Sequence, residues 1–312
     1  MNINQYISSF QNQELSKQDF IELAYAKSHA TLFAYSTLLK NNAIKKIEIE
    51  KNRVSCELNS GIKMIIPPND IRSIPLEILN FGDHESSELN IQKKLLNNCH
   101  TIFDIGANHG WYSLEIAKAF PDKTVIAFEA VPATFKLFKS NLALNNDLRN
   151  IQAVQAALSN EVGEASFFYN PNLSVNASFQ NLQNNDLAEQ ITVETETLDQ
   201  FCIQHNIFPD FIKCDVEGAE LKVFQGAEKI LRKYQPIICT EMLRKWSNAF
   251  NYHPNEIIKF LEILNYQCFS IKQGLSNISA IEKIEENTQE TNFIFMPKSK
   301  LSLLKEFDNV TH

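Results

Sequence analysis

The sequence has 312 residues, of which 44% are hydrophobic and 21% charged, with 8 glycines and 10 prolines. This composition excludes collagen-like and intrinsically disordered proteins, and the length allows one large domain or a domain with an appendage. The 29 Lys and Arg against 37 Asp and Glu give a net charge of −8, and no basic stretch stands apart, so nucleic acid is not an expected partner.

The first 80 residues are predicted to form a small extension. Residues 16–40 place apolar side chains at helical spacing and predict one or two helices. From Ile44 to Ile66 the spacing changes to two, with a turn at residues 59–61, which predicts a β-hairpin. Pro67, Pro68 and Pro75 make the following stretch irregular and place a domain boundary near residue 80.

Residues 81–298 alternate strand and helix patterns, which is typical of a mostly parallel sheet flanked by helices, and residues 299–312 are predicted to be a C-terminal tail. The predicted strands are Thr101–Ile105, Thr124–Glu129, Ile151–Ala156, Phe211–Asp215, Ile237–Glu241, Gln267–Ile271 and Asn292–Met296.

The expected location is cytoplasmic. The six cysteines stand singly, without metal-ligand spacing to histidines, which suits a reducing compartment. The N-terminal residues lack the basic and apolar regions of a secretory signal. The most apolar stretch, residues 20–39, is interrupted by Glu22, Lys27 and His29, so no membrane span is expected.

The strand ending in Asp104 is followed by the loop Gly106-Ala-Asn-His-Gly110 and then by a helical pattern. Two glycines permit a tight turn and close approach of a ligand, and free N–H groups of a helix N-terminus can face an anion. The spacing differs from the dinucleotide fingerprint, and a purely structural glycine turn stays an alternative. The next strand ends in Glu129, where a carboxylate can accept both hydroxyls of a ribose.

A third block brings Asp215, Glu217 and Glu220 into one short turn after a buried strand, with Glu241 at the end of the adjacent strand. Carboxylates this close repel one another unless a cation or a proton lies among them. They are candidates for a general base, a divalent-metal site or the partner of an amine. Glu220 is expected to stabilise a helix N-terminus instead. His253 is a weaker candidate for a base.

The motifs together resemble the FkbM-type methyltransferases that use S-adenosylmethionine, over about residues 85–271. The matching segments are Asp104-x-Gly106-Ala-Asn108-x-Gly110-x-Tyr112-Ser113, Phe128-Glu129-Ala-Val-Pro132, Thr197-Leu-Asp199 and Ile212-Lys-x-Asp215-Val-Glu217-Gly218-Ala-Glu220.

The resemblance implies a class I methyltransferase (Rossmann-like) fold with a seven-stranded sheet, and S-adenosylmethionine as cofactor. Its glycine loop would wrap the methionine part of the cofactor and Glu129 would hold the ribose. The full set of implied cofactor residues is Glu85, Asp104, Gly106, Asn108, Gly110, Tyr112, Ser113, Glu129 and Ala130.

The family resemblance also implies transfer of a methyl group to a hydroxyl of a sugar, glycan or related natural product. We expect Asp215, Glu217 or Glu241 to act as the base or to hold a divalent metal such as magnesium. The N-terminal extension would cap the pocket or form a homodimer. The alternatives are a non-catalytic cofactor-binding regulator or scaffold and, less favoured by the glycine spacing, a nucleotide-dependent oxidoreductase.

Overall fold

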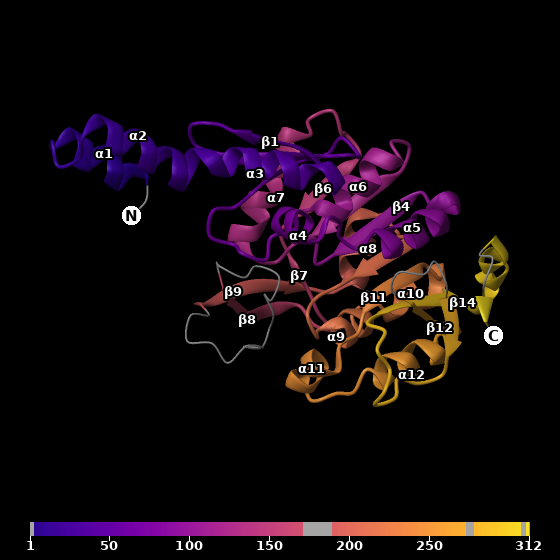
Figure 1. Ribbon diagram of the computed structural model, residues 1–312. Coiled ribbons are helices and arrows are strands. Elements are labelled where there is room, and N and C mark those ends of the chain that lie inside the picture. Colours follow the sequence, from indigo (N-terminus) through magenta and orange to yellow (C-terminus); the bar gives the residue numbers. More distant parts are fainter. Residues whose placement is uncertain (1–2, 171–188, 273–277, 307–309, 312) are drawn as a thin grey trace.

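The computed structural model describes residues 3–170, 189–272, 278–306 and 310–311. The chain begins with a helical arm, residues 3–41, that projects from the rest of the molecule (Figure 1). One or two helices were expected here, and the structure adds a further helix before them. The arm consists of α1 (Ile3–Gln11), α2 (Lys17–Ala24), a π-helical turn (Tyr25–His29), α3 (Ala30–Leu38) and a 3-10 turn (Leu39–Asn41).

The predicted β-hairpin is part of a three-stranded antiparallel sheet formed by β1 (Ile44–Ile49), β2 (Val54–Leu58) and β3 (Lys63–Ile65). Two buried asparagines attach β3 to the main domain. Asn145 Oδ1 accepts a hydrogen bond from the Lys63 N–H at 2.8 Å, and Asn141 Oδ1 accepts one from the Ile65 N–H at 2.8 Å. The small sheet is therefore fixed against the helix that carries both asparagines.

The main sheet contains all seven predicted strands, in the order β6-β5-β4-β10-β11-β14-β12, and β13 and β15 extend it to nine strands in the described residues. Within the seven, β14 alone is antiparallel to its neighbours. This is the expected class I methyltransferase-like fold. The strands are β4 (Thr101–Ile105), β5 (Thr124–Phe128), β6 (Ile151–Val154), β10 (Phe211–Cys214), β11 (Ile237–Glu241), β12 (Tyr266–Ile271), β13 (Ile278–Ile281), β14 (Asn292–Pro297) and β15 (Val310–Thr311).

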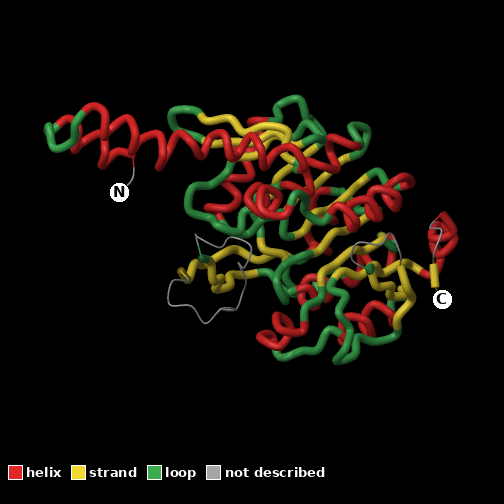
Figure 2. The backbone as a smooth tube through the Cα atoms, viewed as in Figure 1, coloured by secondary structure: helices red, strands yellow, loops and turns green. Residues whose placement is uncertain are grey.

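Helices flank this sheet (Figure 2). They are α4 (Ile74–Phe81), α5 (Ser86–Leu95), α6 (Trp111–Ala119), α7 (Pro132–Leu144), α8 (Leu198–His205), α9 (Glu220–Gln225), α10 (Glu228–Tyr234), α11 (Arg244–Ser247) and α12 (Asn255–Ile263), with 3-10 turns at Leu96–Asn98, Asn248–Phe250 and Lys298–Glu306. A second small sheet, β7 (Ala157–Leu158), β8 (Gly163–Tyr169) and β9 (Glu189–Glu196), lies beside it. Among the described residues, no helix is long and apolar enough to cross a bilayer.

Two hydrophobic cores lie on the two faces of the main sheet, because side chains alternate along each strand. Ile102 belongs to one core together with residues of α5, α6 and the small N-terminal sheet, whereas Phe103 and Ile105 belong to the other, with α8, α9, α10 and α12. Asp104 therefore lies on the α5 and α6 face. The N-terminal extension shares the first core with the main sheet.

Substitution of Asn141 tests whether the attachment of the small sheet contributes to the stability of the protein. Its amide also donates to the His109 carbonyl at 2.8 Å, so one side chain joins β3 to the glycine loop. Asn141→Ala leaves two buried backbone groups unpaired and is expected to lower the free energy of unfolding by about 3 kcal/mol in urea titrations. Asn90→Ala, at an exposed position of α5, is the control and should change it by less than about 0.5 kcal/mol. Equal losses in the two variants would contradict this role.

Candidate functional site

A cavity of about 330 Å³ opens at the carboxyl ends of β4, β5, β10 and β11. This is the edge at which open α/β sheets bind ligands. The predicted site residues that line it are Glu85, Gly106, Asn108, Tyr112, Glu129, Ala130, Asp215, Glu217 and Glu241. Asp104, Gly110 and Ser113 lie outside its lining.

The glycine loop after β4 is shaped by contacts within the protein. Gly106 has a φ of 84°, and a side chain there would place its Cβ 1.9 Å from the Asp215 carbonyl oxygen. Gly110 has a φ of 85°, and its Cβ would meet the Phe138 ring at 2.1 Å. Both positions therefore require glycine because of neighbouring protein atoms, whereas the sequence suggested close approach of a ligand.

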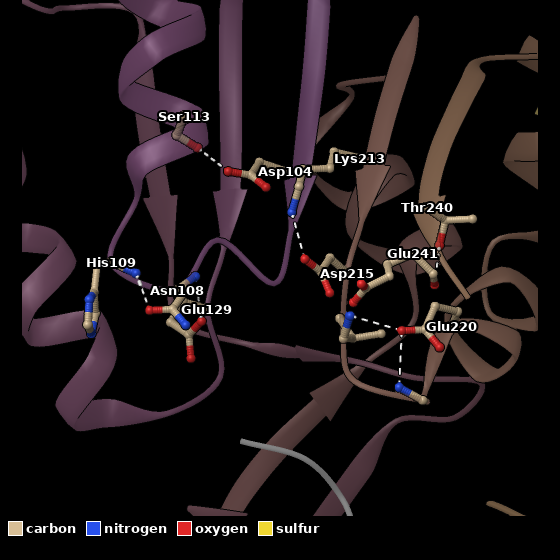
Figure 3. Close-up of polar contacts among 12 residues, drawn as sticks. Asp104, Asn108, His109, Ser113, Glu129, Lys213, Asp215, Glu220, Thr240 and Glu241 are labelled. Carbon is tan, nitrogen blue, oxygen red and sulfur yellow. Dashed lines mark hydrogen bonds and ion pairs between the residues drawn. The ribbon is translucent and has the colours of Figure 1, made fainter. Parts of the chain in front are cut away.

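Glu129 closes this loop from the end of β5. Its Oε2 accepts a hydrogen bond from the Asn108 N–H at 2.9 Å, and Figure 3 shows the two residues side by side. Its Oε1 accepts a hydrogen bond from the Val131 N–H at 2.8 Å. Burial raises the pKa of this carboxyl group to about 7, against the lowering effect of the two backbone donors. Each carboxylate oxygen carries a second lone pair, so Glu129 can still accept a hydrogen bond from a ligand hydroxyl.

Asp104 and Lys213 are paired across neighbouring strands β4 and β10. Asp104 is fully buried, and its Oδ2 accepts a 2.6 Å hydrogen bond from the Ser113 hydroxyl. Lys213 Nζ lies 3.2 Å from Asp215 Oδ2 and so stands between two carboxylates (Figure 3). Burial alone would lower the pKa of Lys213, but Asp215, Asp104 and Glu85 raise it above its ordinary value. A charged ammonium therefore lies in the wall of the cavity.

The acidic cluster consists of Asp215, Glu217 and Glu241, which offer one carboxylate oxygen each within 4.8 Å of one another. Burial, followed by the charge of Asp215, raises the pKa of both Glu217 and Glu241. Like charges this close disfavour full ionisation, so the cluster retains a proton at a pH where ordinary carboxyl groups have lost theirs. The acidic cluster can therefore accept a proton or attract a cation.

Glu220 has a different position from these acids. Its Oε1 accepts hydrogen bonds from the N–H groups of Val216 and Gly218, both at 3.1 Å, and its Oε2 accepts one from the Tyr252 hydroxyl at 3.3 Å. The carboxyl group thus ties down the turn that carries Asp215 and Glu217. Burial raises its pKa to about 7, although three backbone donors oppose the shift.

Three residues of the cavity wall hold a left-handed backbone although they are not glycines: Glu85 at φ 46°, Asn108 at φ 50° and Glu217 at φ 52°. This conformation costs an ordinary side chain about 1–2 kcal/mol and is concentrated at functional sites. All three residues were predicted to be site residues from the sequence. Their backbone strain is independent support for a site at this edge.

Several residues of the cavity wall were missed by the sequence analysis. Lys213 belongs to a matching sequence motif but was not predicted to be a site residue. Its spacing of two from Asp215 puts both side chains on one face of the chain. His84 also lines the cavity and packs edge-on against Trp111 at a centroid distance of 4.7 Å. Arg72, Lys245 and Trp246 complete the wall. His253, by contrast, is exposed outside the cavity lining, and its Nδ1 accepts a hydrogen bond from the Asn255 N–H at 3.1 Å.

A family model for the Methyltransferase FkbM domain matches residues 104–268, more than half of the chain. The protein belongs to the FkbM methyltransferase domain family. This match begins at Asp104, near the end of β4, contains β5, β6, β10 and β11, and includes all residues of the acidic cluster.

Two curated relatives match parts of this FkbM protein. Methyltransferase sdnD of Sordaria araneosa is 30% identical over 156 residues, which cover 41% of this chain and 60% of the relative. Methyltransferase 1 of Beauveria bassiana is 28% identical over 145 residues, which cover 41% of this chain and 58% of the relative. The chain thus spans about three fifths of the length of these relatives. A crystal structure of Methyltransferase FkbM from Methylobacillus flagellatus KT aligns with 87% of this chain and 60% of its own, at 13% identity and a TM-score of 0.44.

The requirement for glycine at position 106 can be separated from the effect of a positive φ. Gly61 has a φ of 87°, and its Cβ would meet only Lys118 Cε at an ordinary 3.6 Å. Gly61→Ala should therefore lower the free energy of unfolding by about 1 kcal/mol. Gly106→Ala adds the clash with Asp215 and should cost at least about 3 kcal/mol more in urea titrations. Equal losses in the two variants would show that the close approach of Gly106 to the Asp215 carbonyl does not matter for stability.

The buried carboxyl group of Glu220 predicts a pH dependence of stability. With its pKa raised to about 7 from an ordinary 4.5, the folded chain holds a proton that the unfolded chain has released. Stability should therefore fall as the pH rises from about 5 to about 7, with a slope of up to about 1.4 kcal/mol per pH unit from this group. Glu220→Gln can keep the two backbone hydrogen bonds and should flatten the slope measured by urea unfolding.

Glu262→Gln, at an exposed position of α12, is the matched control for this measurement and should retain the slope of the wild-type protein. If Glu220→Gln and the wild-type protein show the same slope, the buried carboxyl group does not contribute to it.

Proposed function

We propose that this FkbM protein binds S-adenosylmethionine in the cavity and transfers its methyl group to a hydroxyl of a sugar, glycan or related natural product. The observation that carries the proposal is the juxtaposition, in one cavity, of a carboxyl group at the end of β5 with three carboxyl groups at the ends of β10 and β11. Membership of the FkbM family supports it, since the family match includes all four of these carboxyl groups.

The cofactor would lie along the glycine loop with its ribose at Glu129. Ala156, Ala157 and Leu158 provide an apolar wall next to that carboxyl group, which suits the flat face of an adenine ring. The negative charge of Asp215 and its neighbours suits the positive sulfonium and amino group. A neutral or anionic ligand would gain nothing from that charge.

Bound S-adenosylmethionine supplies a methyl group activated by the sulfonium. In the transfer the carbon–sulfur bond breaks, a carbon–oxygen bond forms, and the acceptor hydroxyl gives up its proton. Alignment of donor and acceptor and removal of this proton are what the protein contributes. Asp215, Glu217 or Glu241 accepts the proton, and the raised pKa values of Glu217 and Glu241 make their ionised forms stronger bases than an ordinary carboxylate.

The same three carboxylates could instead hold magnesium, which would lower the pKa of a bound acceptor hydroxyl. Carboxylate oxygens are the donors that this cation prefers, and each of the three residues offers one. Titrations and assays with and without magnesium separate the two roles. If methyl transfer requires magnesium, the acidic cluster holds the metal. If methyl transfer is equal with and without magnesium, the cluster serves proton transfer.

Glu129 provides the test of cofactor binding. Glu129→Ala should weaken S-adenosylhomocysteine binding at least about tenfold in calorimetric titrations, because a charge-assisted hydrogen bond to the ribose is lost. The analogue of S-adenosylhomocysteine that lacks the ribose 2′-hydroxyl should bind the wild-type protein more weakly than S-adenosylhomocysteine does. The Glu129→Ala variant should bind the two compounds with equal affinity. This double comparison isolates the contact from any loss of stability. Glu194→Ala, at an exposed position of β9, is the control. Full affinity in Glu129→Ala would remove the ribose role.

Asp215 and Glu241 provide the test of chemistry. Asp215→Asn and Glu241→Gln should each lower methyl transfer to a panel of glycosyl hydroxyls, measured at saturating S-adenosylmethionine, by about 10²-fold or more. Unchanged transfer in both variants would overturn the base assignment. Tight cofactor binding by the wild-type protein without transfer to any acceptor would favour a regulator or scaffold, and stabilisation by NAD instead would favour an oxidoreductase.

A further inference from the structure

The helical arm, residues 3–41, leaves its apolar side chains in solvent. Only Tyr6 and Ala24 of the arm are buried. Figure 1 shows α1 and α2 pointing away from the main domain. The exposed large apolar residues are Ile7, Phe10, Ile21, Tyr25, Leu32, Phe33, Tyr35 and Leu38, with Phe33 at 66% and Leu32 at 53%. Eight exposed large apolar side chains on one projecting segment are typical of an interaction site.

The sequence of α3 explains why the arm needs a partner. Its nine residues, ATLFAYSTL, include no charged side chain, and none of them is buried in the described chain. A helix that carries mostly apolar and no charged side chains is typical of a buried environment. α3 continues the helix of α2 and the π-helical turn, and none of its residues packs into the described chain as a buried side chain. The isolated chain therefore lacks the contacts that would stabilise α3.

The base of the arm is attached firmly to α4. Asn42 Nδ2 donates to the Ile78 carbonyl at 2.8 Å, and the Ala43 N–H donates to the Gly82 carbonyl at 2.7 Å. Phe81, at the end of α4 and next to Gly82, is 76% exposed and adds an apolar side chain near the base of the arm. A partner that covers α3 can thus extend over Phe81.

The charge of the arm decides which partner fits. Lys17, Lys27 and Lys40 are balanced by Glu14, Asp19 and Glu22, so the net charge of −8 lies outside the arm. A symmetric dimer brings a surface against its own copy, which a neutral apolar surface tolerates and a charged one does not. An anionic lipid surface would need an excess of Lys and Arg along the polar face, which the arm lacks.

We infer that the arm is the dimerisation surface of this protein, with the α3 region and Phe81 covered by the arm of a second copy. The two acidic main domains then remain apart, while the neutral arms bury their apolar side chains. This inference does not depend on methyl transfer.

The test is the mass of the full chain in sedimentation equilibrium between about 1 and 50 µM, a range in which a dimer of micromolar affinity forms. The wild-type protein should have twice the mass of one chain, and Leu32→Glu with Phe33→Glu should weaken association at least about 100-fold. Glu is a good helix former, and both positions are exposed, so the variant should fold. The matched control is Ile203→Glu with Ile263→Glu, at positions 63% and 71% exposed on the main domain, which should remain dimeric.

A wild-type protein that stays monomeric throughout this range would overturn the inference, and so would a dimer that the arm substitutions leave intact. A monomer that sediments with vesicles of anionic phospholipid would assign the arm to a membrane surface instead.

Discussion

The ammonium group of Lys213 is the constraint on which the site depends. It lies in the wall of the cavity, bonded to Asp215 and paired across the strands with Asp104, at the ends of the central parallel strands. Without this cation, the buried carboxyl group of Asp104 and the partly exposed one of Asp215 would lack this positive partner, which a folded protein avoids by protonation or by unfolding. Lys213 therefore permits β4 and β10 to end in acids at the same edge of the sheet.

One lysine does not balance all the acids that converge here. Asp215 also faces Glu217 and Glu241, whose pKa values are raised first by burial and then by the charge of Asp215. The turn that presents them is costly in itself, because Glu217 has a left-handed backbone at φ 52° although it is not a glycine. Glu220 stabilises this turn through two backbone N–H groups. The result is a preorganised surplus of negative charge facing a cavity, a suitable environment for a cationic ligand.

The sequence predicted the sheet well because its signal is local. Each central strand is a short apolar run bounded by turn residues, and all seven predicted strands are present. The extra strands β13 and β15 and the helix α1 were missed, since the two strands have only 4 and 2 residues and α1 has one buried residue, Tyr6. Periodicity gives little signal where few side chains are buried.

The site was predicted less completely, because its partners come from distant parts of the chain. Asp104 was expected to face the cofactor, yet the strand register turns it toward Ser113 and Lys213, below the cavity. The reason for glycine at Gly106 is the Asp215 carbonyl, more than a hundred residues away in sequence, and no local pattern contains that information. Lys213 and His84 were overlooked because their role appears only when four strand ends meet.

The most direct test of the account is a crystal structure of the protein with S-adenosylhomocysteine. We expect the ligand in the cavity of about 330 Å³, with its ribose hydroxyls within hydrogen-bond distance of Glu129 and its sulfur facing Asp215, Glu217 and Glu241. A ligand bound elsewhere, or a cavity that stays empty at saturating ligand concentration, would contradict the account.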